Sequence, residues 1–174
     1  KIIVRGSNFR KIKRVDDVVK VFMKIIEVMP AKLLLLGDGP ERPYVESICR
    51  DCVISDKIKF LGKQEQMEDI LPIADLFLLT SEYESFGLAA LEAMAAGVPV
   101  ISTNAGGLGE INIPGETGFL SDIGDIDSMS RQAITILQDD AILKQFKERS
   151  AEHAKTYDIA NIIPLYEKLY ERFL

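Results

Sequence analysis

Residues 75–97 read DLFLLTSEYESFGLAALEAMAAG and combine the signals of a strand, a turn and a helix. The apolar run at 76–80 predicts a buried strand, and the segment 85–96 predicts a buried helix that ends at a glycine. A helix that begins directly after such a strand presents free amide groups and the positive end of its dipole. The stretch therefore predicts an anion site at the helix N-terminus, beside Ser85 and Gly87.

Two carboxylates, Glu84 and Glu92, stand at the start of this predicted helix and inside it. At about 1.5 Å per residue, Glu92 lies roughly 9 Å into the helix, and helical side chains lean back toward the N-terminus. This places its carboxylate about one sugar ring from a bound phosphate, which is the shape of a nucleotide. A charge in an apolar helix is costly unless it is paired, so the alternative for Glu92 is an internal salt bridge. Glu84 contacts the same ligand or only helps to initiate the helix.

The composition is that of an ordinary globular domain of 174 residues, with 47% hydrophobic and 28% charged residues. The net charge of −6 argues against nucleic acid as a partner. Five of the 21 basic residues nevertheless lie between positions 5 and 14, namely Arg5, Arg10, Lys11, Lys13 and Arg14. They form either a solvated loop or a local patch that faces a phosphate.

The two cysteines, Cys49 and Cys52, are three residues apart on a predicted helix. A zinc site would need two further ligands, and the single histidine, His153, is far along the chain, where we expect it at the surface and not as a catalytic base. We therefore expect reduced thiols and a cytoplasmic protein. Apolar runs stay shorter than a membrane span requires, and no signal peptide is recognisable. Because the chain starts directly in a strand-like run, we expect a piece of a longer protein.

Strand-like and helix-like segments alternate along the whole chain. The predicted strands cover 1–4, 31–36, 58–61, 76–80, 98–102 and 118–120, and the predicted helices cover 16–29, 41–53, 67–73, 85–96, 125–137, 141–155 and 159–173. This alternation predicts an α/β, Rossmann-like, doubly wound parallel sheet of about six strands, with helices on both faces. Ligands bind such sheets beyond the carboxyl ends of the strands.

Five predicted loops meet at that edge, at 7–13, 37–42, 62–63, 81–87 and 104–110. The turn at 37–40, Gly-Asp-Gly-Pro, matches neither a dinucleotide fingerprint nor a P-loop, so it is either a tight turn or a close approach of backbone to ligand. The loop at 104–110 carries three glycines in four positions, and we expect it to contact the ligand.

Taken together, these segments resemble the retaining glycosyltransferases of family 4 (glycosyl transferases group 1), which have the GT-B fold. The resemblance rests on Glu84-x7-Glu92 with Ser-Phe-Gly-Leu between, on Gly-Asp-Gly-Pro-Glu-Arg at 37–42, on Phe-Leu-Gly at 60–62, on Asn-Ala-Gly-Gly at 104–107 with Glu110, and on Gly-x-x-Gly-Phe-Leu at 115–120. It covers essentially residues 1–174 and corresponds to the C-terminal, donor-binding half of such an enzyme, without the N-terminal acceptor domain. Within the family, residues 7–18 are most similar to the bacillithiol-pathway enzymes that transfer N-acetylglucosamine to L-malate.

The resemblance implies a role for each matching residue. Glu92 binds the ribose hydroxyls of a nucleoside diphosphate sugar, Glu84 contacts the donor sugar near its 3-hydroxyl, and Lys13 neutralises the diphosphate. The implied donor-binding set also contains Ser85, Phe86, Gly87 and Leu88 at the diphosphate, Lys63 in the segment that flanks the base, and Ser7, Asn8, Gly37, Gly39, Gly106 and Gly107.

Two positions depart from the family pattern. An arginine is usual five residues before the lysine, where this chain has Asn8, so either Arg10 supplies that charge beside Lys13 or Asn8 hydrogen-bonds a phosphate. Gly109 also stands where proline is common before Glu110.

The implied reaction transfers a hexose or N-acetylhexosamine, with retention and without a metal or cofactor, from a donor for which a UDP-sugar is favoured. The missing N-terminal domain binds the acceptor, and peripheral membrane contact is expected only through the full-length enzyme. The chain alone is expected to be inactive. The alternatives are another GT-B enzyme, such as a 2-epimerase or a phosphorylase, and a non-catalytic Rossmann-like binding module.

Overall fold

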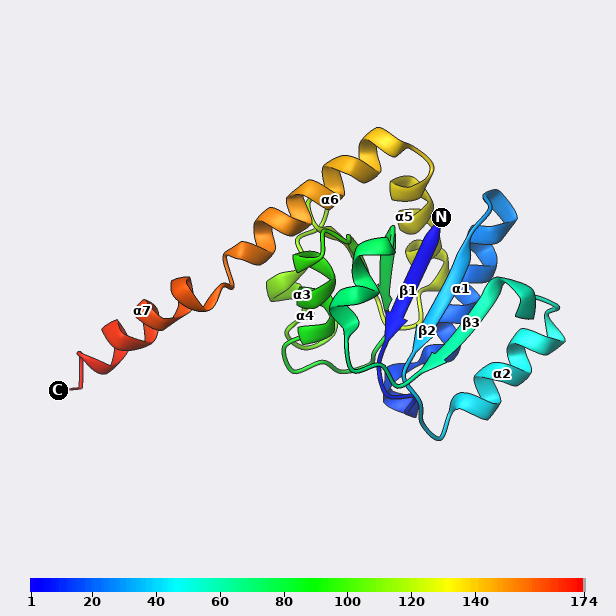
Figure 1. Ribbon diagram of the computed structural model, residues 1–174, viewed down its shortest axis with the longest axis horizontal. Coiled ribbons are helices and arrows are strands. Elements are labelled where there is room, and N and C mark those ends of the chain that lie inside the picture. Colours follow the sequence, from blue (N-terminus) through cyan, green and yellow to red (C-terminus); the bar gives the residue numbers. More distant parts are fainter. Residues whose placement is uncertain (174) are drawn as a thin grey trace.

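The computed structural model describes residues 1–173 as a layered α/β fold (Figure 1). The strands are β1 (Ile2–Gly6), β2 (Lys32–Leu36), β3 (Ile58–Gly62), β4 (Leu76–Leu79), β5 (Val100–Thr103) and β6 (Gly118–Ser121). The α-helices are α1 (Val15–Val28), α2 (Arg42–Asp51), α3 (Leu88–Ala95), α4 (Leu108–Ile111), α5 (Ile126–Leu137), α6 (Asp140–Lys155) and α7 (Ile159–Tyr170). Short 3-10 turns cover Lys11–Lys13, Ser55–Lys57, Met67–Asp69 and Leu71–Ile73.

The six strands form one parallel sheet in the order β3-β2-β1-β4-β5-β6. In the centre, Ile3 of β1 pairs with Leu33 of β2 on one side and with Leu76 of β4 on the other. The chain winds outward in one direction from β1 to β3 and in the other from β4 to β6. The predicted doubly wound sheet is thus confirmed, and its switch point lies between β1 and β4.

Both faces of the sheet are covered, which explains why the strands read as continuous apolar runs. Ile3 and Leu78 face a core shared with α1, α2 and α5, whereas Val4 and Phe77 face a core shared with α3 and α4. Helix α6 contributes to both cores, through Phe146 to the first and Ala154 to the second.

Two predicted segments differ in the structure. Residues 67–73 form two 3-10 turns instead of one short helix, because Pro72 has no N–H group with which to continue a helical ladder. Residues 108–111, predicted as part of a loop, form the single helical turn α4.

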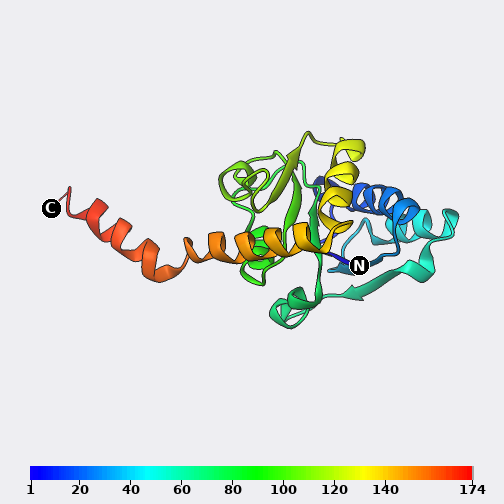
Figure 2. The same cartoon turned by 90° about the horizontal axis from the view of Figure 1, so that it is seen from above.

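The start of α5 is capped by a side chain. Asp125 caps α5, and its side chain accepts a hydrogen bond of 2.9 Å from the amide of Ser128, which lowers the pKa of the carboxyl. Helix α7 extends away from the sheet beyond α6, and none of its residues is buried (Figures 1 and 2). Within residues 1–173, no helix is both long and apolar enough to cross a membrane.

The cysteines and the histidine lie outside the carboxyl edge. Both thiols are free, with Cys49 buried and Cys52 exposed, and burial raises the pKa of Cys49 to about 11. His153 is half-buried and packs edge-on against Tyr157, with ring centroids 5.5 Å apart. The predicted surface position of His153 is therefore confirmed only in part, since an aromatic neighbour covers part of the ring.

Asn112 holds the β5–β6 side of the sheet through a buried amide. Its Nδ2 lies 3.1 Å from the carbonyl of Val100, 2.9 Å from Ser102 Oγ and 3.0 Å from the carbonyl of Phe119. Its Oδ1 accepts a hydrogen bond of 3.0 Å from Thr117 Oγ1. One fully buried side chain thus joins both strands to the turn that precedes β6.

Replacing Asn112 with alanine should lower the free energy of unfolding by about 2–3 kcal/mol, because buried acceptors then lose their donor. Urea unfolding followed by circular dichroism measures this loss. The matched control is Asn161→Ala on the exposed helix α7, which should stay within about 0.5 kcal/mol of wild type. Equal effects of the two substitutions would show that the buried amide does not hold this side of the sheet.

Candidate functional site

A pocket of about 480 Å³ lies at the carboxyl edge of the sheet, beside the switch point. Its wall comes from the ends of β1 and β2, from the segment after β3 and from α3, with the lining residues Gly6, Ser7, Asn8, Leu36, Gly37, Asp38, Lys63, Gln64, Glu65, Met67, Ala89 and Glu92. Five of the sequence-predicted residues therefore share one pocket, namely Ser7, Asn8, Gly37, Lys63 and Glu92.

Glu92 reaches this pocket from the exposed face of α3. The helix begins at Leu88 and not at Ser85, so Glu92 lies about 6 Å into it at roughly 1.5 Å per residue, one turn instead of two. Only Ala90, Ala93 and Met94 of the helix are buried, so the prediction of a buried helix is wrong for the face that carries Glu92. This carboxylate forms no salt bridge or hydrogen bond with residues 1–173, which leaves it available to a ligand.

The turn before α3 explains the late helix start. Gly87 adopts the left-handed conformation with φ of 96° and caps the helix, so Ser85 and Phe86 remain outside it and exposed. The carbonyl of Gly87 accepts the amides of Ala90 and Leu91. The amides ahead of these first intrahelical bonds have no partner within the helix, as at any helix N-terminus, and this is the end of α3 at which an anion is expected to bind.

The glycine-rich loop supports this turn from behind. Gly106 has φ of 57°, and a Cβ there would lie 1.9 Å from the carbonyl oxygen of Glu84. The amide of Gly107 donates to the same oxygen at 2.9 Å, and a Cβ at Gly107 would lie 2.6 Å from the carbonyl oxygen of Ser85. Neither glycine lines the 480 Å³ pocket, so the contact these residues make is with the turn that carries Glu84.

Gly37 and Gly39 also lie where a backbone carbonyl of another loop leaves no room for a side chain. A Cβ at Gly37 would lie 1.7 Å from the carbonyl oxygen of Ser7, and one at Gly39 would lie 2.5 Å from that of Phe9. The amide of Phe9 donates to the carbonyl of Asp38 at 2.9 Å. The close backbone approach is therefore between the loops after β1 and β2, and it shapes the pocket wall on which Gly37 lies.

Lys13 and Glu84 form an ion pair across the switch point. Lys13 Nζ lies 2.6 Å from Glu84 Oε1, and the two side chains are 20% and 16% exposed. Ser81 Oγ donates to the same carboxylate oxygen at 2.8 Å. Lys13 and Glu84, which were predicted separately as site residues, are thus brought together, with Ser81 as a partner that sequence reasoning missed.

Arg10 is not part of this arrangement. It is exposed and lines a separate pocket of about 210 Å³ with Lys11, Glu41 and Glu82. Of the two residues considered as replacements for the usual arginine, Asn8 lines the larger pocket and Arg10 does not.

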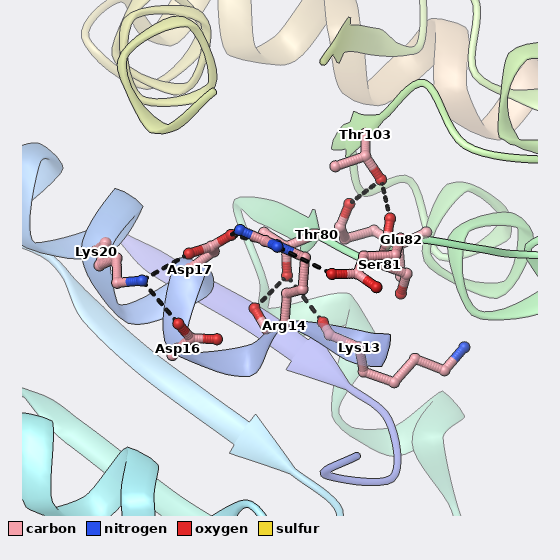
Figure 3. Close-up of polar contacts among 10 residues, drawn as sticks. Lys13, Arg14, Asp16, Asp17, Lys20, Thr80, Ser81, Glu82 and Thr103 are labelled. Carbon is pink, nitrogen blue, oxygen red and sulfur yellow. Dashed lines mark hydrogen bonds and ion pairs between the residues drawn. The ribbon is translucent and has the colours of Figure 1, made fainter. Parts of the chain in front are cut away.

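The backbone carbonyls of the loop that carries Lys13 accept hydrogen bonds from a threonine at the end of β4 (Figure 3). Thr80 Oγ1 lies 2.8 Å from the carbonyl oxygen of Arg14 and 3.1 Å from that of Lys13. Thr103 Oγ1 donates to the carbonyl of Ser81 at 2.6 Å. Threonines at the ends of β4 and β5 therefore fix both loops that carry the ion pair.

Arg14 also links the loop after β1 to the segment after β4 (Figure 3). It adopts a left-handed conformation with φ of 46° and forms ion pairs of 2.6 Å with Asp17 and 3.0 Å with Glu82. Lys20 joins Asp17 to Asp16 along the first turns of α1. Part of the basic cluster at positions 5–14 is therefore a structural network, and a positive φ at a non-glycine residue carries no recognisable sequence signal.

A protein-family model described as Glycosyl transferases group 1 matches residues 1–153. The chain is 44% identical over 171 residues to the N-acetyl-alpha-D-glucosaminyl L-malate synthase of Bacillus anthracis, covering 98% of the chain and 45% of that protein. It is 32% identical over 142 residues to the 2-deoxystreptamine N-acetyl-D-glucosaminyltransferase of Niallia circulans, covering 80% of the chain and 36% of that protein. The chain thus spans less than half the length of both relatives.

Solved structures show the same fold. The pneumococcal O-GlcNAc transferase GtfA in complex with UDP and GlcNAc superposes with a TM-score of 0.89 at 21% identity, covering 98% of this chain and 35% of that one. HepE of Anabaena in complex with UDP and glucose superposes with a TM-score of 0.84 at 21% identity, covering 99% and 47%. The fold is therefore the Rossmann-like α/β fold of GT-B glycosyltransferases.

Replacing Gly106 with alanine should destabilise the protein by about 1–3 kcal/mol, because φ is positive there and the new Cβ meets the carbonyl of Glu84. Gly109→Ala is the matched control, since its Cβ would meet only a side-chain atom of Asn104 at 3.3 Å. The control should change the free energy of unfolding by no more than about 0.5 kcal/mol in urea titrations. If both variants unfold at the same urea concentration, the loop does not depend on the contact at Gly106.

Proposed function

This chain belongs to the glycosyl transferases group 1 family, and on that premise we propose that it is the nucleotide-sugar-binding domain of a retaining, metal-independent glycosyltransferase of family 4. The favoured donor is UDP-N-acetylglucosamine. The observation that carries the proposal is the 480 Å³ pocket at the switch point, which contains Glu92 and lies at the same edge of the sheet as the ion pair of Lys13 and Glu84.

The chemistry of the pocket suits a nucleoside. Its volume is in the range of about 300–1,000 Å³ that is usual for small-molecule sites. The Glu92 carboxylate has two acceptor oxygens, which match the vicinal hydroxyls of a ribose. With the ribose at Glu92, we assign the base to the part of the pocket lined by Lys63 and Gln64, which follow β3.

The diphosphate is assigned to the gap between α3 and the loop after β1. The amides at the start of α3 and the helix dipole attract an anion there. Ser7 Oγ is a second candidate contact, since this buried hydroxyl has no hydrogen-bond partner among residues 1–173 and its residue lines the pocket. A buried polar atom without a partner is costly, and a phosphate oxygen satisfies it.

In the proposed reaction, the bond between the sugar and the diphosphate breaks, an acceptor hydroxyl attacks the anomeric carbon from the same face, and its proton passes to the departing diphosphate. Negative charge then develops on the departing diphosphate. Lys13 and the α3 amides stabilise this charge by charge-assisted hydrogen bonds. Glu84 contacts the sugar that is transferred. We assign the acceptor to an N-terminal domain outside this chain, so the chain alone binds donor without turnover.

Isothermal titration calorimetry with UDP-, GDP- and ADP-sugars tests the proposal. We expect measurable binding with a preference for the UDP-sugar, and Glu92→Gln should weaken UDP binding by about tenfold because a charge-assisted hydrogen bond is lost. The same substitution should weaken the binding of 2′-deoxy-UDP less, since that ligand lacks one of the two hydroxyls that Glu92 would bind.

The matched control is Glu27→Gln, which makes the same change of charge at the opposite end of the sheet and should leave binding unchanged. Equal binding of all three sugar nucleotides, or none, would contradict the proposed function and favour a binding module of another kind. Sugar transfer by the chain alone would contradict the assignment of the acceptor to another domain.

A further inference from the structure

Arg5 is the most unusual charged residue of the fold. It lies on β1, is fully buried, and its Nε and Nη1 have no hydrogen-bond partner among residues 1–173. Burial lowers the pKa of its guanidinium to about 10, although the nearby charge of Glu84 opposes the shift. A buried cation without a contacting carboxylate destabilises a fold, so packing alone does not explain an arginine here.

The one polar side chain that Arg5 contacts leads to the candidate site. Arg5 Nη2 donates to Ser81 Oγ at 3.2 Å and lies 3.5 Å from the carbonyl oxygen of Lys13, at the outer limit of a hydrogen bond. Because Ser81 Oγ accepts from Arg5, its own proton is directed to Glu84 Oε1, 2.8 Å away. Arg5, Ser81 and Glu84 therefore form a relay with a fixed direction.

This relay fixes one oxygen of Glu84 and leaves the other free. Oε1 accepts hydrogen bonds from both Ser81 and Lys13, whereas Oε2 accepts none from residues 1–173. If Lys13 turns to the diphosphate, as the proposed function requires, Glu84 loses its ion-pair partner. Ser81 then remains the hydrogen-bond donor to Glu84, and the buried guanidinium of Arg5 remains the donor to Ser81.

We propose that Arg5 is a positioning residue, which acts through Ser81 to hold Glu84 with Oε2 presented to a hydroxyl of the donor sugar. The inference rests on the proposed function and extends it to a residue that touches neither nucleotide nor sugar. The buried charge costs stability and is kept because it orients Glu84 after Lys13 has engaged the ligand.

NMR titrations of the chain with UDP and with UDP-N-acetylglucosamine test this role, since Arg5 should matter only for the sugar. We expect Arg5→Met to raise the ratio of the Kd for UDP-N-acetylglucosamine to the Kd for UDP by about tenfold, the size of one hydrogen bond to a charged group. Glu84→Gln should raise the ratio similarly, and the double variant should raise it no further, because both changes remove the same interaction. Arg5→Lys should give an intermediate ratio.

Thermal unfolding separates positioning from packing. Arg5→Met should keep or raise the Tm, because it replaces a buried charge with an apolar side chain of similar length. A lower Tm with equal weakening of both ligands would show a structural role and overturn the proposal. Ile3→Met, on the same face of β1, is the control and should leave the ratio of the two Kd values unchanged.

Ser81→Ala provides a second route, because it interrupts the relay and leaves Arg5 in place. A folded Ser81→Ala variant with the wild-type ratio would overturn the inference, even if Arg5→Met does not fold. If the wild-type chain binds neither UDP nor UDP-N-acetylglucosamine, the proposed function fails and the inference fails with it. If wild type binds both and every variant keeps its ratio, the inference alone fails.

Discussion

Glu84 is the residue on which the geometry of the site depends, because it joins three loops at once. Its carboxylate accepts hydrogen bonds from Lys13, in the loop after β1, and from Ser81, directly after β4. Its backbone carbonyl accepts the amide of Gly107, in the loop after β5. A partly exposed ion pair contributes little stability by itself, so the supports around Glu84 matter as much as the pair. They include the threonine hydroxyls, the left-handed turn at Arg14 and the close approach of Gly106.

The charges around Glu84 also explain how an acidic chain can offer a site for a nucleoside diphosphate. The net charge is −6, yet Lys13 and the buried Arg5 both lie beside the single carboxylate of Glu84. Around Glu84 itself, two cations therefore lie beside one carboxylate, and the start of α3 adds its dipole. The amides at the start of α3 need no rearrangement when an anion forms, whereas Lys13 turns from Glu84 to the diphosphate when the donor binds.

The sequence was sufficient to predict the sheet, because six short apolar runs between helical segments allow few other arrangements. Glu84 and Glu92 could be chosen as site candidates from their spacing after a strand end, and Lys13 from the family resemblance; the structure brings Lys13 and Glu84 into contact. The start of α3 was less predictable, because the left-handed Gly87 shortens the helix and moves Glu92 from an expected buried position to an exposed one. The supporting roles of Gly106, Thr80 and Arg5 depend on contacts between distant segments, which a single sequence does not display.

A crystal structure of the chain with UDP tests the central claim most directly, because it locates the nucleotide relative to Glu92 and Glu84. We predict that the ribose hydroxyls lie within hydrogen-bond distance of the Glu92 carboxylate. We also predict that the diphosphate lies at the start of α3, with Lys13 Nζ moved from Glu84 toward it. UDP bound elsewhere, such as in the pocket at the opposite end of the sheet formed by Met29, Lys32 and Asp56, would contradict the account.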